Sequence, residues 1–296
     1  MSKLSENFGR RFVVTGEIAP PRGHDLTSFN HEVEFFKPLM KKLYAVNVVD
    51  IPGSLLLMSS LGASILLQQN RLEPVFQMVC RDRNVLALEA DLISAAAFGI
   101  ENVLALTGDH PKVKSSDHKD ARPVFDLDSS RLIKVVKGMN DGVDINGRKL
   151  NMKTSFFLGA ALAPGVNPLE PEIYKTRRKL FAGADFFQTQ AVFEPELMES
   201  FFRGYEKVFK EDVRKKVLMS VVPLYSYDMV RFLKTMPGIV ISDKTGKRIK
   251  QAKDPLKAGV DIAVEVVEKA RDMNVAGVHV MPAGKTEALV EILNRI

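Results

Sequence analysis

The sequence predicts an α/β protein that folds as a single (β/α)8 barrel, a TIM barrel. Its length of 296 residues suits such a barrel, which commonly has about 250 residues. Short β-branched runs alternate with longer segments of helical period, as in repeated βαβ units. No composition break or Pro/Gly-rich linker divides the chain. We therefore expect one domain over residues 1–296, with an open doubly wound sheet as the alternative.

The apolar pattern predicts each element in turn. Strands are expected at 12–16, 45–49, 75–79, 102–106, 154–160, 185–189, 217–222 and 277–280. Helices are expected at 27–42, 57–69, 84–98, 128–139, 171–182, 194–209, 227–235, 256–273 and 285–295. Pro195 in a first turn, and Gly99 and Gly183 after two helix ends, agree with these bounds. The widest irregular stretch, 108–125, is long enough to indicate a functional loop.

Composition excludes several classes of function. The net charge of +6 comes from Lys and Arg scattered between 207 and 257, which indicates a solvated face; no nucleic-acid motif is present. The single cysteine, Cys80, forms no disulfide within the chain and is typical of a reducing cytoplasm. The longest apolar run, 55–67, is too short to span a bilayer, and no signal peptide is visible. The histidines lack metal-ligand spacing, so we expect no metal.

Polar residues gather where the predicted strands end. In a barrel these ends form one face, which carries the active site. The residues are Glu17, Asn47, Asp50, Gln77, Cys80, Thr107, Gly108, Asp109, Asn167, Gln188, Gln190, Tyr225, Tyr227 and His279. Loops often begin with polar residues, so any one of these residues is weak evidence for a site. The convergence of polar residues at all the strand ends is stronger evidence.

The stretch VVTGEIAPPRG places one carboxylate, Glu17, between an apolar strand and a rigid Pro-Pro turn. Such a setting partly desolvates a carboxyl group, as suits a general acid. The chain has no Gly-x-Ser-x-Gly elbow and no His-Glu-x-x-His, and TGDHP lacks the spacing of a phosphate-binding P-loop. Without a nucleophile constellation, a cofactor is expected to carry the chemistry.

Four ordered blocks, GEIAPPRG, VLALTGDHP, YKTRRKLFAGADFFQTQAVF and GVHVMPAG, resemble the methylenetetrahydrofolate reductase family. The resemblance runs from about residue 12 to the C-terminus. The sequence of these motifs is most similar to that of the short form of the family, which lacks a regulatory domain and is often associated with the acetyl-CoA pathway. The resemblance implies a flavin-dependent enzyme that interconverts 5,10-methylene- and 5-methyltetrahydrofolate.

The same resemblance implies roles for individual residues. Glu17 matches the general acid that opens the folate's imidazolidine ring, and Asp109 matches the acid near pterin and flavin. Gln190, Tyr227 and His279 match folate-binding positions. The implied flavin contacts are Asn47, Gln77, Thr107, Gly108, Asp109, Glu172 and Lys179.

Three departures from the family pattern lie at flavin positions. Thr107 stands where the familiar enzymes have Arg, Val49 where they have Thr, and Gln77 where they have His. Because a guanidinium pairs well with phosphate, its loss leaves FMN as the alternative to FAD. The resemblance implies NAD(P)H or a partner electron-transfer subunit as the electron donor, and a homo- or hetero-oligomer is expected. The alternative functions are a reductase of another pterin carrier and a passive folate-binding subunit.

Overall fold

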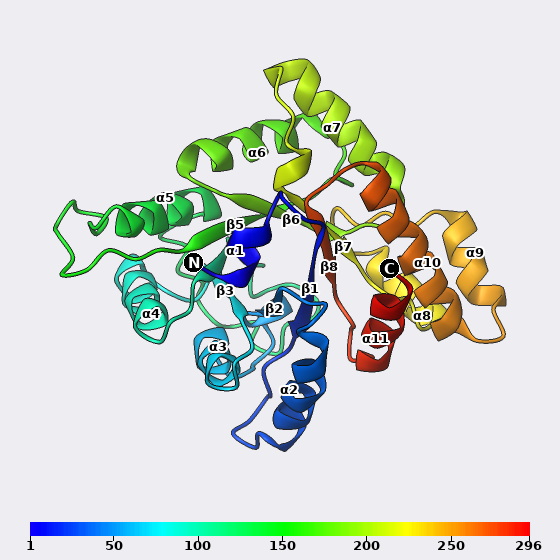
Figure 1. Ribbon diagram of the computed structural model, residues 1–296, viewed down its shortest axis with the longest axis horizontal. Helices are drawn as coiled ribbons and strands as arrows, with labels where there is room; N and C mark the ends of the chain where they lie inside the picture. Colours follow the sequence, from blue (N-terminus) through cyan, green and yellow to red (C-terminus); the bar gives the residue numbers. More distant parts are fainter. The chain divides into compact units, whose positions relative to one another are not determined.

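The computed structural model describes residues 1–296 and contains eight strands in a closed barrel (Figure 1). Around the barrel the strands follow chain order, which confirms the predicted (β/α)8 fold. The strands are β1 (Val13–Ile18), β2 (Ala45–Val48), β3 (Pro74–Val79), β4 (Asn102–Leu106), β5 (Phe157–Leu162), β6 (Phe186–Ala191), β7 (Val217–Val221) and β8 (Gly277–Val280).

Helices alternate with these strands along the chain. They are α1 (Lys3–Asn7), α2 (Thr27–Leu39), α3 (Ser60–Gln69), α4 (Val85–Ala97), α5 (Ser129–Asn140), α6 (Glu170–Ala182), α7 (Pro195–Phe209), α8 (Tyr227–Leu233), α9 (Asp243–Gln251), α10 (Pro255–Asp272) and α11 (Thr286–Arg295). Two 3₁₀ turns, η1 (Pro52–Ser54) and η2 (Arg214–Lys216), complete the set. No helix combines the length and the apolar character that crossing a bilayer requires.

Three strand predictions are wrong by two or more residues at an end: those of β1, β5 and β6, the last of which continues to Ala191 instead of ending at 189. β1 continues to Ile18, so Glu17 lies inside the strand rather than after it. The fifth strand begins at Phe157, not at 154, because the residues before it bond to the end of α5. Asn140 Oδ1 accepts hydrogen bonds from Thr154 Oγ1 (2.7 Å) and Phe156 N (2.8 Å).

The sequence analysis missed α1 and α9. α1 has only five residues, too few to show a period. In α9 only Ile249 among the large apolar residues is buried, so the apolar pattern is weak. Its start is nevertheless marked, because Ser242 Oγ accepts a hydrogen bond from Thr245 N (3.1 Å).

The chain divides into two compact units, each made of several segments. Unit 1 comprises residues 1–6, 17–160 and 178–185. In it, β2, β3 and β4 pair in parallel, with Asn47 opposite Val75 and Gln77 opposite Leu104. α3, α4 and α5 follow one another beside these strands (Figure 1).

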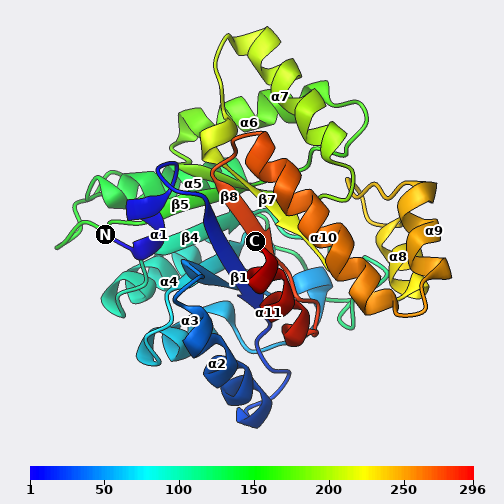
Figure 2. The same ribbon diagram turned by 45° about the vertical axis from the view of Figure 1, so that its right-hand side comes forward.

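Unit 2 comprises residues 7–16, 161–177 and 186–296. In this unit β6, β7 and β8 pair in parallel, and β8 also pairs with the first residues of β1. Gly277 in β8 permits this close pairing, because a Cβ there would lie 1.9 Å from Val13 O. α10 contacts α11, α9 and α7 within the same unit (Figure 2).

Candidate functional site

The carboxyl ends of β2 and β3 in unit 1 present two buried amide side chains. Asn47 is fully buried in β2, and Gln77 in β3 is 7% exposed. The side-chain amide of Gln77 makes no hydrogen bond within the protein, and its nitrogen and oxygen stay accessible to solvent. A ligand at this strand end would find a preformed donor and acceptor in Gln77.

β4 ends in the TGD turn, where Thr107 and Asp109 are exposed. Thr107 Oγ1 accepts a hydrogen bond from Ser129 N (3.1 Å), in the first turn of α5. The Asp109 carboxylate has no hydrogen bond or ion pair within the protein. Gly108 has a φ of 89°, and an added Cβ would lie 3.1 Å from the Cβ atoms of Val79 and Arg81. Only glycine fits this turn without strain, and Asp109 is free for a ligand.

Two arginines that the sequence analysis did not select organise these strand ends. Arg81 is 1% exposed, and its Nη2 donates to Ile51 O (3.0 Å) while its Nη1 donates to Asp109 O (3.3 Å). Asp82 pairs with the same guanidinium at 2.6 Å. Arg81 therefore fixes the backbone of the loops after β2 and β4 together. The signal was present in RDRN, since two arginines directly after a buried strand require partners.

Arg83 forms the second part of this network. Its Nη1 donates to Asp50 Oδ2 (2.7 Å), its Nη2 donates to Asp50 Oδ1 (3.1 Å), and its Nε lies 3.1 Å from Asp91 Oδ2. Asp50 Oδ2 also accepts a hydrogen bond from Val79 N (2.9 Å). Burial opposes the charge on Arg83, but the hydrogen bonds and the charge of Asp50 outweigh it and raise the pKa of Arg83. This pair joins the ends of β2 and β3.

The irregular loop between β4 and α5 is anchored by one carboxylate, Asp117. Its Oδ2 lies 2.5 Å from Arg22 Nη1, and its Oδ1 lies 2.7 Å from His118 Nδ1. Leu56 N donates to the same carboxylate (3.1 Å). The hydrogen bonds from His118 and Arg22 hold the pKa of Asp117 well below its ordinary value. The carboxylate thus ties the loop to the segment after β1, which contains Arg22, and to the segment after η1.

Glu17 is half-buried in β1, directly before this Arg22 segment. Its position places the carboxyl group at the end of the same strand, followed by Pro20 and Pro21. Unit 1 therefore contains Glu17, Asn47, Gln77, Thr107, Gly108 and Asp109 among the predicted site residues. Lys179, 8% exposed in α6, belongs to the same unit.

Unit 2 holds the other predicted residues. Gln190, at the end of β6, is exposed, and its Cγ lies 4.0 Å from the Cβ position of Gly238. Tyr227 begins α8, is 38% exposed, and lies under Lys250 Nζ at 5.3 Å from the ring centroid. Both side chains have surface available for a ligand.

His279 and Glu172 are more enclosed. His279 is fully buried in β8, and its Nδ1 lies 2.9 Å from Thr15 Oγ1 of β1. Glu172 in α6 is 5% exposed, and its Oε1 accepts a hydrogen bond from Ala163 N (3.0 Å). The structure thus gives both residues structural contacts inside unit 2, while their predicted ligand contacts stay predictions.

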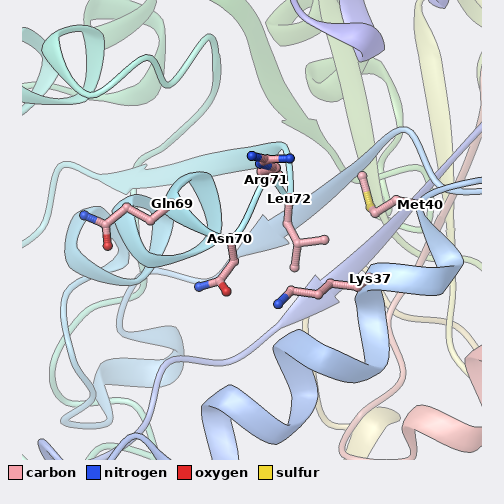
Figure 3. A pocket seen from close by; sticks show the side chains of 6 residues that line it. All are labelled: Lys37, Met40, Gln69, Asn70, Arg71 and Leu72. Carbon is pink, nitrogen blue, oxygen red and sulfur yellow. The ribbon is translucent and has the colours of Figure 1, made fainter.

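Two surface pockets differ in their relation to these residues. A pocket of about 330 Å³ is lined by Thr107, Phe125, Asp126, Leu127, Asp128 and Arg131, beside the end of β4. A second pocket of about 390 Å³ is lined by Lys37, Met40, Gln69, Asn70, Arg71 and Leu72 (Figure 3). The latter lies by the segment that leads into β3, at the opposite strand end, and includes no predicted site residue. No group of three or more His, Cys, Asp or Glu is arranged to hold a metal ion.

Comparison of the sequence with known families gives a match over nearly the whole chain. The family model described as methylenetetrahydrofolate reductase matches residues 3–296. Methylenetetrahydrofolate reductase 2 of Schizosaccharomyces pombe is 26% identical over 234 residues, 73% of this chain and 34% of the relative. A probable methylenetetrahydrofolate reductase (NADPH) of Caenorhabditis elegans is 24% identical over 249 residues, 80% of this chain and 34% of the relative. The chain spans about a third of the length of these curated relatives.

Solved structures share the fold. An uncharacterized protein from Clostridium thermocellum, which binds two copies of 5-methyl-5,6,7,8-tetrahydrofolic acid, superposes with a TM-score of 0.69 at 14% identity. The match covers 98% of this chain and 96% of that chain. A 2,3-dimethylmalate lyase of the PEP mutase/isocitrate lyase superfamily superposes with a TM-score of 0.52 at 9% identity, covering 99% and 84%. At these identities the likeness concerns the fold alone.

Proposed function

This chain belongs to the methylenetetrahydrofolate reductase family, and from that premise we propose that it is a flavin-dependent reductase. It interconverts 5,10-methylenetetrahydrofolate and 5-methyltetrahydrofolate within one barrel domain of residues 1–296. The observation that carries the proposal is the family match over residues 3–296 of a barrel whose strand ends bear Glu17, Gln77 and Asp109. A cytoplasmic setting is part of the same proposal.

Glu17 is the general acid of this proposal. The imidazolidine ring of the folate must open before the methylene carbon accepts hydride, and protonation of the departing nitrogen opens it. A half-buried carboxyl group at the end of an apolar strand suits that proton transfer, because partial exclusion of water strengthens its interaction with the nitrogen. Gln190, Tyr227 and His279 bind the pterin, with the Gln190 amide as hydrogen-bond partner and the Tyr227 ring as an apolar wall.

The strand ends of unit 1 fit a flavin. Gln77 offers an unengaged amide that solvent can reach, Asp109 an unengaged carboxylate, and Gly108 a close-packed turn that brings backbone near a ligand. Asn47, Thr107, Glu172 and Lys179 complete the proposed cofactor contacts. A flavin bound there would supply the hydride for the methylene carbon. FAD is the expected form, and FMN is the alternative because Thr107 provides no cation for a pyrophosphate.

The reducing equivalents come from NAD(P)H or from a partner electron-transfer subunit. These two donors differ in a direct assay. If NADH or NADPH alone reduces the purified holoenzyme, the enzyme needs no partner subunit. If only an artificial donor reduces it, the electrons come from a partner subunit.

The decisive variant is Glu17→Gln, with Glu34→Gln as the matched control. Glu34 is an exposed carboxylate of α2 whose only ion pair is with Lys37. We expect Glu17→Gln to keep its flavin and to lower folate turnover by about 10² to 10⁴-fold, the usual contribution of a positioned acid. Glu34→Gln should match the wild type. Wild-type turnover by Glu17→Gln contradicts the role of Glu17, and a protein that takes up neither FAD nor FMN contradicts the reductase.

A further inference from the structure

The outer face of α4 is apolar along its whole length. Leu86 is 73% exposed, Ile93 is 49% exposed and Phe98, directly after the helix, is 53% exposed. Ala90 and Ala97 are exposed between them. The outer face of a surface helix normally carries polar and charged residues, so this face has the character of a covered one.

The charged residues of α4 are engaged away from this face. Glu89 is buried, and its Oε1 accepts a hydrogen bond from Ile145 N (2.7 Å). Asp91 pairs with Arg83. Neighbouring α3 contains no charged residue, and its Gln68 donates to Gly99 O at the end of α4 (3.0 Å). α3 and α4 contact each other and lie side by side in both views (Figures 1 and 2). No charged residue of α3 therefore borders the outer face of α4.

Large and small residues on α4 are ordered in a self-complementary way. Leu86, Ala90, Ile93 and Ala97 are separated by four, three and four positions, the spacing of a helix-packing seam. If a second α4 lies antiparallel across a two-fold axis, Leu86 faces Ala97 and Ala90 faces Ile93. Each large side chain then meets a small one, and the symmetry repeats both pairs. Alanines at these positions allow helix axes to approach to about 8 Å, the short end of the usual range.

We propose that this chain forms a two-fold symmetric dimer in which α4 packs antiparallel against α4 of a second copy. A second copy of the chain fits this face better than a charged partner does, because the outer face of α4 has no charge that such a partner could complement. Packing two copies of this face together also brings no like charges close to the two-fold axis. From Leu86 to Ala97 the seam is about 16 Å long, and α3 lies beside it. A face two helices wide measures roughly 20 by 20 Å, which supplies the apolar core of a standard interface of about 800 Å² per partner.

The first test is the mass of the native protein in solution by light scattering over a range of concentrations. We expect a dimer for the wild type and a monomer for Ile93→Lys, with unchanged circular dichroism because position 93 is half exposed. Val208→Lys is the matched control: it places the same charge at an exposed apolar position of α7 and should remain a dimer. A monomeric wild type, or an Ile93→Lys protein that is still a dimer, overturns the proposal.

The antiparallel geometry has its own test. Ala90→Glu alone should dissociate the dimer, and the double variant Ala90→Glu/Ile93→Lys should restore it, because the introduced lysine of each copy then faces the introduced glutamate of the other. Oxidative crosslinking adds a second readout. Ala90→Cys mixed with Ile93→Cys should crosslink more than either variant alone, and Cys80 is buried and gives no background. Failure of both restoration and mixed crosslinking overturns the antiparallel arrangement.

Discussion

Replacement of Arg83 by methionine isolates the buried ion pair that joins β2 and β3. Arg83→Met keeps most of the side-chain volume and removes the guanidinium. The Asp50 side chain is fully buried and would lose both hydrogen bonds from Arg83, keeping only the one from Val79 N. Asp91 would lose its ion pair as well.

The expected cost is large because an uncompensated charge stays buried. Removal of one partner from a buried ion pair destabilises proteins by about 3 to 5 kcal/mol. The Arg83 side chain is 13% exposed, so solvent screening reduces this cost only slightly. At roughly 2 to 4 °C per kcal/mol for a chain of this order of size, the melting temperature should fall by about 6 to 20 °C.

The assay is thermal and urea unfolding of holoenzyme followed by circular dichroism. The double variant Asp50→Asn/Arg83→Met should be more stable than Arg83→Met alone, because the buried charge is gone. Arg231→Met is the control, since Arg231 pairs with Asp228 at an exposed site and should change stability little. A cost below about 1 kcal/mol for Arg83→Met, within the range of surface changes, refutes the reasoning.

Three further predictions concern single features. Asp117→Asn should make the loop of residues 108–125 more sensitive to protease. In the wild type the folded-state pKa of Asp117 is depressed, so the loop should stay protected above the unfolded pKa of about 3.9. This protection should be lost only as the pH falls below that value. A protection loss between about pH 7 and 5, above that unfolded pKa, would contradict this assignment. Cys80 should not react with a thiol reagent in native protein at about pH 8, because burial raises its pKa to about 12; rapid labelling would disagree. Gly277→Ala should give an unstable protein, because its Cβ would overlap Val13 O at 1.9 Å, and a wild-type melting temperature would count against that geometry.

The barrel was predictable because its strands and most helices carry strong local patterns. β1, β2 and β8 are rich in β-branched residues, the other strands are short and mostly apolar, and helices such as α5 and α10 have an apolar period that survives in their buried residues. The bounds of β1 and β5 were not predictable to the residue. Whether Thr154 starts a strand or bonds to Asn140 depends on a contact between separate segments.

The strand-end residues were predictable as a group, and their partners were not. Asn47, Gln77 and Asp109 follow from position on a strand end. The roles of Arg81 and Asp117 depend on which loops meet, and His279 is held by Thr15, 264 residues away along the chain. Such contacts are set by the three-dimensional packing and leave only a weak signal in one sequence.

The central claim is tested most directly by one anaerobic measurement on flavin-reconstituted protein. Reduced holoenzyme is mixed with 5,10-methylenetetrahydrofolate while the flavin absorbance is recorded and the folate product is separated by chromatography. The account predicts reoxidation of the flavin with one equivalent of 5-methyltetrahydrofolate formed. A flavin that stays reduced in the presence of this folate would contradict it.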